Sequence, residues 1–399
     1  MKRAFDPGPR PRTIDPFLGE IPRSLFDERT FGSCELADRY ATDLALDLVR
    51  RLGLAEPLAR GGDVEELAAG REFAPGFRPA LATLLARLAE AGEIDREPAG
   101  GRARFVARRP LREPELAELR ALGLERDPSV APTLDLLDAA AAAYPAIAAG
   151  TSTGEQELFS AGRIALWLAY FSNSNPVYAI NNLQAAVVAA NRLPAGAGLR
   201  LLEVGAGAGS FTVALLEELE RRGRLGDLAL YDFTEPSPFF RRRGERELKA
   251  RWPGLPLRSR ALDLDRPFAE QGGADGYQLA VGVNVLHAAR DLGAALGRVR
   301  EALLPGGWLV AGECLRLFPG QTVPADLVFQ LFASFTEVAT DPELRPAHGF
   351  LEPATWRRAL AAAGFEGVAV LPDLDRIRDH YPRFFAGVVC GCRPTLESR

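Results

Sequence analysis

The sequence LLEVGAGAGS at residues 201–210 decides the fold class. Apolar residues between 199 and 204 predict a short buried strand, and residues 211–222 carry apolar side chains at helical spacing. Between them lies a turn in which glycines let the backbone approach a ligand closely. A strand, a glycine turn and a helix form the first unit of an open α/β sheet. The three glycines stand at alternate positions, Gly205, Gly207 and Gly209.

The acid two residues ahead of the glycines indicates the kind of ligand. A dinucleotide-binding turn reads G-x-G-x-x-G and holds a diphosphate at the start of its helix. Here Ser210 takes the place of the last glycine, and Glu203 at the end of the strand would repel a diphosphate. Glu203 could instead bind an ammonium group, directly or through water. The motif therefore favours S-adenosylmethionine over NAD, and a purely structural turn is the alternative.

Two acids further along the chain fit the same ligand. Residues 228–233 read as a second buried strand, and Glu235 follows where an open parallel sheet places a carboxylate on the ribose hydroxyls. Residues 260–264 read as a third strand, where Asp263 could accept a hydrogen bond from the adenine amine. The alternatives are a helix N-cap for Glu235 and a turn residue for Asp263. Leu264 and Asn284 complete the expected cofactor contacts.

The later strands set the architecture. Residues 277–285 and 309–314 read as the fourth and fifth strands, and 386–391 could close the edge of the sheet. Helical patterns separate most of these strands. The sequence therefore predicts an α/β fold with a Rossmann-like, doubly wound, mostly parallel sheet, whose site lies across the carboxyl ends of the strands.

Three further segments carry a resemblance to a known family. They are FTEPSPFF at 233–240, NVLHAARD at 284–291 and DPELRPAHGFLEPATWRRALAAAGF at 341–365. Together with the glycine motif they resemble class I S-adenosylmethionine-dependent methyltransferases, and more narrowly the C-methyltransferase domains of polyketide synthases, over roughly residues 134–392. The family more often has Asp where this chain has Glu235. The chain shows no carrier, ketosynthase or acyltransferase motif, so we expect a free-standing form.

His287 and Glu313 are the expected catalytic pair. A histidine at the end of the fourth strand can take a proton when an acceptor holds its other nitrogen, and Glu313 ends the adjoining strand. Both match the His–Glu base dyad of the family. The resemblance implies methylation of the α-carbon of a β-ketoacyl thioester or a similar enolisable polyketide-type substrate. An O- or N-methyltransferase of a small-molecule natural product, and a winged-helix regulator with a vestigial methyltransferase fold, are the alternatives.

The sequence gives fewer indications of the residues that contact the methyl acceptor. The polar segment FSNSNPVYAINNLQ at 171–184 lies on predicted helices over the cleft. Tyr178 and Asn181 are candidate substrate contacts there, and His348 is a third candidate in a later loop. No spacing of metal ligands appears, and the four cysteines form no disulfide framework.

Composition and residue pattern predict the domain boundaries, the location and the partners of the protein. We expect a mobile arm at 1–30, a helical, winged-helix-like domain at 31–132, a helical lid at 133–195 and the cofactor-binding domain at 196–399. The net charge of −5 argues against nucleic-acid binding, and the absence of a signal peptide or apolar span argues for a cytoplasmic protein without a membrane segment. Small-molecule or carrier-bound acyl groups are the expected substrates, and a homodimer is an open alternative. A basic edge could dock an acidic acyl carrier protein; its members are Arg102, Arg104, Arg108, Arg109 and Arg112.

Overall fold

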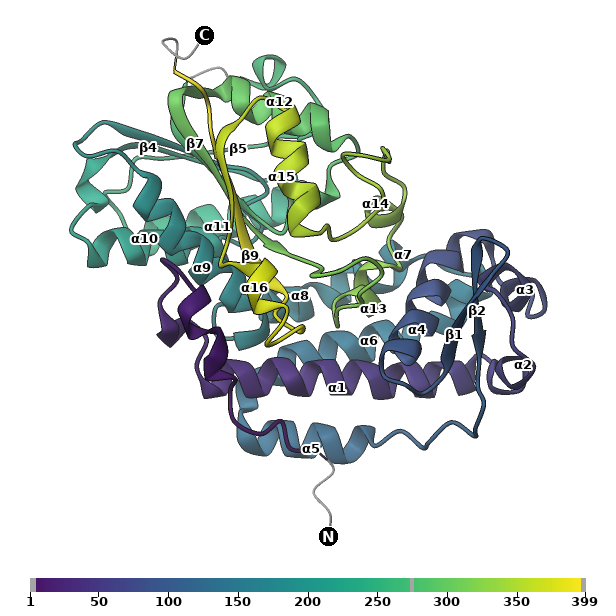
Figure 1. Ribbon diagram of the computed structural model, residues 1–399. Helices are drawn as coiled ribbons and strands as arrows, with labels where there is room; N and C mark the ends of the chain where they lie inside the picture. The colour runs from purple at the N-terminus through teal and green to yellow at the C-terminus, as the bar shows by residue number, and fades with distance from the viewer. Residues whose placement is uncertain (1–4, 273–275, 396–399) are drawn as a thin grey trace.

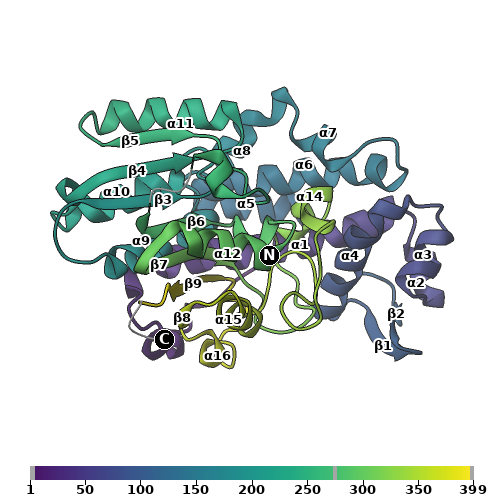
Figure 2. The same cartoon turned by 90° about the horizontal axis from the view of Figure 1, so that it is seen from above.

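A seven-stranded sheet forms the centre of the larger part of the molecule. The computed structural model describes residues 5–272 and 276–395, and its sheet has the strand order β5-β4-β3-β6-β7-β9-β8 (Figures 1 and 2). The first five strands in this order run parallel, and β9 is antiparallel to both β7 and β8. The predicted doubly wound, mostly parallel architecture is confirmed. The strands are β3 (Leu199–Glu203), β4 (Leu228–Thr234), β5 (Leu257–Arg260), β6 (Tyr277–Val283), β7 (Leu303–Cys314), β8 (Glu366–Leu371) and β9 (Ala386–Cys392).

Helices cover the sheet because its strands are apolar on both faces. Helix α9 crosses β6, β7 and β9 and packs beside α10, while α12 and α15 contact each other on the opposite face (Figure 1). At Gly312 of β7 an added Cβ would lie 2.9 Å from the Asn181 carbonyl oxygen, so α9 runs directly over the strand that carries Glu313. These helices are α9 (Pro176–Arg192), α10 (Ser210–Arg221), α11 (Pro238–Arg251), α12 (Leu292–Ala302), α15 (Pro353–Ala362) and α16 (Leu374–Ile377).

A second hydrophobic core lies in the N-terminal helical layer. Long helix α1 packs against α4, α5, α6 and α9, and the hairpin of β1 (Asp95–Ala99) and β2 (Arg102–Val106) follows α4 as expected from the glycines at 100 and 101. Residues 323–350 leave the sheet domain and pack into this core. Their short helices are α13 (Asp326–Phe329) and α14 (Ala333–Thr336); the layer itself holds α1 (Glu28–Arg51), α2 (Ala55–Arg60), α3 (Val64–Ala69), α4 (Arg78–Glu90), α5 (Leu116–Arg126), α6 (Ala131–Ala148), α7 (Gly154–Leu158) and α8 (Ile164–Tyr170).

Two local features differ from the expectations. Within the expected arm, residues 5–30 are packed against the rest of the chain. Phe5 packs against the helical layer, whereas Ile14, Leu18 and Phe26 occupy an apolar site beside the C-terminal segment, where Phe26 contacts Phe384. Strand β5 ends at Arg260, so Asp263 lies in the loop beyond it.

Within residues 5–272 and 276–395, none of the helices combines the length and the hydropathy that crossing a bilayer requires. The same residues contain no cluster of three or more His, Cys, Asp or Glu placed to hold a metal ion.

Candidate active site

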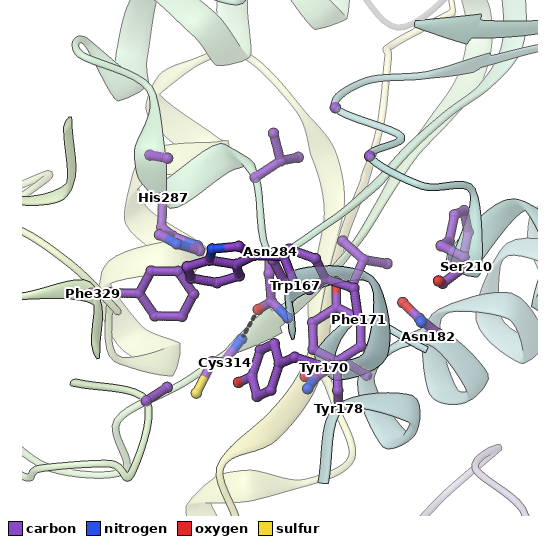
Figure 3. A pocket seen from close by; sticks show the side chains of 18 of the residues that line it. Trp167, Tyr170, Phe171, Tyr178, Asn182, Ser210, Asn284, His287, Cys314 and Phe329 are labelled. Atoms are coloured by element: carbon purple, nitrogen blue, oxygen red, sulfur yellow. Dashed lines mark hydrogen bonds between the residues drawn. The ribbon is translucent and has the colours of Figure 1, made fainter. Parts of the chain in front are cut away.

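A cavity of about 740 Å³ lies between the carboxyl ends of the strands and the helical layer. Its walls come from the glycine turn, the loops after β4, β6 and β7, helices α6, α8 and α9, and α13. Figure 3 shows His287 and Phe329 on one side and Ser210 and Asn182 on the other. The glycine turn and His287 therefore border one and the same space, while Glu313 lies behind His287 and outside the lining.

The glycine turn keeps this space open. Gly205 has a φ of 62°, and a Cβ on it would lie 2.3 Å from Cγ2 of Val285 in the loop after β6. The Gly207 amide donates to Glu235 Oε2 at 3.0 Å. Only residues without a side chain allow the two loops to approach this closely at a positive φ.

Glu203 is almost fully buried at the base of the turn. Its Oε2 accepts hydrogen bonds from the Thr212 hydroxyl at 2.6 Å and from the Tyr231 hydroxyl at 2.7 Å. Desolvation raises the pKa of the Glu203 carboxyl to about 7, although both hydrogen bonds oppose the rise. A cationic ligand in the adjoining cavity would favour the ionised carboxylate.

Glu235 links the turn to the start of α11. Its Oε1 accepts from the Ser237 amide at 2.8 Å, and its Oε2 accepts from Gly207. Burial raises the pKa of this carboxyl above its usual range. Ser237 is the N-cap residue of α11, so Glu235 lies two residues before the cap and is not the N-cap of the alternative interpretation. Its side chain also lines the cavity, where its oxygens have further lone pairs for ribose hydroxyls.

Asp263, Leu264 and Asn284 also line the cavity, whereas Gly209, the N-cap residue of α10, does not. Asp263 is exposed, and its Oδ1 accepts from the Asp265 amide at 2.9 Å, the turn bond of the alternative interpretation. Leu264 is beside it. Asn284 has a φ of 52° and its Oδ1 accepts from the Cys314 amide at 2.8 Å (Figure 3), which ties the end of β6 to the end of β7.

His287 and Glu313 are in direct contact. The His287 Nδ1 lies 2.5 Å from Glu313 Oε2, and Glu313 Oε1 accepts from the Leu286 amide at 3.1 Å. Both side chains are buried, and the imidazole ring also packs edge to face on Phe350. The described residues give Nε2 no hydrogen-bond partner, so the ring presents one free nitrogen at the wall of the cavity.

The structure separates the three expected substrate contacts. Tyr178 and Asn181 line the cavity, whereas His348 does not, because Gln330 holds its Nε2 at 2.9 Å. Burial raises the pKa of the Tyr178 hydroxyl, and a hydrogen bond from the Asn284 side chain opposes this rise. Tyr178 therefore lines the same cavity as His287 and the glycine turn.

The sequence did not indicate which aromatic side chains line the cavity. Trp167 is buried with its indole bonded to the Leu158 carbonyl, and it also borders the cavity. Phe329, at the end of α13, and Phe350, outside the helices and strands, lie more than 40 residues beyond His287 in the sequence. The motif at 341–350 is the sequence feature that could have indicated that this segment reaches the cavity.

The basic edge of the hairpin is largely neutralised within the chain. Arg102 pairs with Asp63 at 3.3 Å, and Arg112 pairs with Asp43 and with Glu93. The other three members are also engaged: Arg104 with carbonyls at 60 and 61, Arg108 with Glu97, and Arg109 with the Gly92 carbonyl. Four of the five arginines therefore have an acidic partner, Arg104 through Glu66 at 3.5 Å, while Arg109 bonds an uncharged carbonyl.

Comparisons with known proteins agree with this geometry. Residues 202–309 match the family model described as Methyltransferase domain. The chain is similar to methyltransferase calH of Penicillium decumbens (37% identity over 174 residues, 43% of this chain and 44% of calH) and to polyketide synthase ThaQ of Burkholderia thailandensis (30% identity, 81% of this chain and 16% of ThaQ). It thus spans less than half the length of either relative.

Two solved structures extend the likeness to the whole chain. The DszA carbon methyltransferase superposes with a TM-score of 0.72 at 25% identity, covering 98% of this chain and 97% of its own. The CurJ carbon methyltransferase superposes with a TM-score of 0.76 at 24% identity, covering 96% and 98%. The chain therefore contains a class I methyltransferase domain, of the kind that uses S-adenosylmethionine, within the fold of the carbon methyltransferases of polyketide synthases.

Proposed function

We propose that this chain transfers a methyl group from S-adenosylmethionine to the α-carbon of a β-ketoacyl thioester or a similar enolisable acyl substrate. The observation that carries the proposal is the buried His287–Glu313 pair with its free nitrogen at the cavity wall. A carbon acid needs an oriented base, and this pair offers one. The names of the synthase relatives support a polyketide-type substrate.

The cofactor site fits the proposed methyl donor. Glu203 and the glycine turn would hold the amino-acid end, Glu235 the ribose, and Asp263 with Leu264 the adenine, while Asn284 lines the same space. A cationic ligand beside the buried Glu203 carboxyl would favour its ionised form and lower the pKa that burial raises. When bound, S-adenosylmethionine supplies the electrophilic methyl group.

The base acts through the nitrogen that faces the cavity. With Nδ1–H donating to Glu313, the lone pair of His287 lies on Nε2, which takes the proton from the carbon between the ketone and the thioester. The C–H electron pair becomes the enolate that accepts the methyl group. The imidazolium that forms is stabilised by the carboxylate of Glu313, and its proton later leaves to solvent.

Tyr178 is suited to stabilise the enolate oxygen. The Asn284 Oδ1 is already used by the Cys314 amide, so the side-chain amide of Asn284 turns its NH2 group toward the Tyr178 oxygen. The phenol then accepts from Asn284 and keeps its own O–H for a substrate carbonyl. A donor at this place lowers the energy of the charge that develops during proton removal.

The acyl chain would lie among the aromatic side chains. Trp167, Tyr170 and Phe329 give this part of the cavity an apolar wall that excludes water from the enolate (Figure 3). We propose delivery of the acyl group on a carrier protein, which the synthase relatives favour. Because four of the five arginines on the hairpin edge already have acidic partners, this edge offers a carrier less unpaired positive charge than the sequence suggested.

One experiment tests the proposal against the O- or N-methylation alternative. The enzyme is incubated with S-adenosylmethionine carrying a ¹³C methyl group and, in parallel, with a β-ketoacyl thioester, the same acyl group on a carrier protein, and a panel of phenols and amines. NMR then locates the label. We expect a methyl group on the α-carbon, with faster turnover from the carrier; a methyl group on oxygen or nitrogen alone would overturn the proposal.

A further inference from the structure

The motif DPELRPAHGF at 341–350 lies against the loop that carries His287, although only its last residue lines the cavity. At its centre, Arg345 is 2% exposed. Among the described residues it forms no ion pair, and its Nε has no hydrogen-bond partner. Burial of an unpaired cation is costly and lowers the pKa of this guanidinium. A side chain kept at such cost requires an explanation beyond packing.

The guanidinium bridges two carbonyl groups of the catalytic loop. Its Nη2 donates to the carbonyl oxygen of His287 at 2.5 Å, and its Nη1 donates to that of Ala289 at 2.6 Å. The amide of Ala339, just before the motif, donates to the Arg290 carbonyl at 2.8 Å. Three carbonyl oxygens within four residues are therefore held by one neighbouring segment.

That segment is itself rigidly closed. Asp341 and Arg345 exchange two backbone hydrogen bonds of 2.9 Å, and the Asp341 carboxylate accepts from the Leu344 amide at 2.8 Å. Arg345 thus projects from a base that is held by these hydrogen bonds within residues 341–345. Separately, Arg358 Nε of α15 donates to the Glu343 carbonyl at 2.9 Å, a contact that involves neither Arg345 nor the His287 loop.

The same motif also contacts the imidazole ring. Phe350 packs against His287 with 4.8 Å between ring centroids, and Phe335 packs at 5.6 Å. Gly349 has a φ of 77°, and a Cβ on it would lie 2.8 Å from the Phe335 ring, so glycine is needed for this packing. The motif therefore restrains both the main chain and the ring of His287.

We propose that residues 341–350 form a clamp, in which Arg345 is a positioning residue for His287. The inference rests on the proposed function, since it concerns the base of that reaction. A planar guanidinium can donate to two carbonyls in a fixed geometry, which a lysine ammonium cannot reproduce. By fixing the His287 main chain, Arg345 keeps Nδ1 in reach of Glu313 and Nε2 directed at the cavity.

The test compares Arg345→Lys and Arg345→Met with Arg358→Gln. The last variant removes a hydrogen bond to the same segment without touching the His287 loop and serves as the matched control. We expect kcat to fall roughly 10- to 100-fold in Arg345→Met and to recover only partly in Arg345→Lys, because a small displacement of a base costs about this much. S-adenosylmethionine affinity should change less than about twofold, and Arg358→Gln should keep wild-type kcat.

A spectroscopic readout separates positioning from general stability. In ¹⁵N NMR of the imidazole, wild type should give one defined His287 tautomer, and the Arg345 variants should give an averaged or altered signal. If Arg345→Lys keeps both the wild-type kcat and the wild-type signal, or if Arg358→Gln loses as much activity, the clamp is refuted. If wild type itself never methylates carbon, the proposed function fails instead, and the NMR comparison still decides the clamp.

Discussion

At the scale of single residues, the glycine motif predicted the position of Glu203 but not its hydrogen-bond partners. The sequence placed this acid at the base of the glycine turn, and the structure finds it there, buried beside the cavity. The spacing could not indicate its two hydroxyl donors, Thr212 and Tyr231, since one lies on the next helix and the other on the adjoining strand. These donors explain how a carboxyl group can be buried there without a cationic partner among the residues that the structure describes.

The raised pKa of Glu203 predicts a pH-dependent stability. Between about pH 4.5 and 7 the folded protein keeps a proton that the unfolded chain loses, so this group's contribution to folding is lost as the pH rises through that window. The loss amounts to roughly 3 kcal/mol for a shift of this size. In Glu203→Gln the loss should disappear.

Urea unfolding of ligand-free wild type and Glu203→Gln at pH 5, 6, 7 and 8 measures this loss of folding stability. Glu235, whose pKa is also raised, titrates in the same direction in both proteins, and the difference between the two curves isolates Glu203. Parallel curves for wild type and variant would show that Glu203 titrates near its ordinary pKa.

Tyr178 gives a second prediction at this scale. Phenylalanine keeps the ring contacts with Tyr170 and Phe171 and removes only the hydroxyl. We expect Tyr178→Phe to reduce kcat roughly 100-fold, since loss of one donor to a developing oxyanion typically costs this much. Steady-state kinetics and S-adenosylmethionine binding measure the effect. A variant with normal kcat and a raised KM would instead make Tyr178 a binding contact.

At the scale of elements, strand register brings the chemistry together. Residues Val283 and Gly312 are paired across β6 and β7, so Asn284 and Glu313 follow at the same edge of the sheet. The sequence predicted this juxtaposition, because the carboxyl ends of neighbouring parallel strands meet at one edge. It did not predict the end of β5, whose Arg258 and Arg260 are accommodated in a strand by pairing with buried Asp232. The apolar run after Arg260 suggested a strand that the chain does not form.

The contact between the glycine turn and the loop after β6 gives an element-scale prediction. Gly205→Ala places a Cβ against Val285 at a positive φ, so we expect the free energy of unfolding to fall by about 1–3 kcal/mol and cofactor affinity to fall at least tenfold. Thermal unfolding and calorimetric titration measure the two effects. Gly226→Ala is the matched control, because its Cβ meets nothing within 4 Å. Equal behaviour of the two variants would contradict the tight approach of the loops.

At the scale of the whole molecule, the cavity lies between two hydrophobic cores. The chain passes between these cores in an order that the sequence did not predict. Periodicity located the sheet and the helices of each part, because each element buries its own apolar stripe. It could not show that residues 323–350 return from the sheet to the helical layer, or that Ile14 and Leu18 pack beside the C-terminal segment. Such contacts depend on tertiary fit between distant segments, and they supply Phe329, Phe350 and Arg345 to the site.

The proposed methyl transfer to carbon depends on His287 acting as the base. The direct measurement is single-turnover methyl transfer to the β-ketoacyl substrate at saturating S-adenosylmethionine, for wild type and His287→Ala, with cofactor affinity measured in parallel. We predict a loss of about 100- to 10,000-fold in the transfer rate, the range that a general base contributes, with affinity changed less than about twofold. A variant that transfers methyl groups at the wild-type rate would contradict the account.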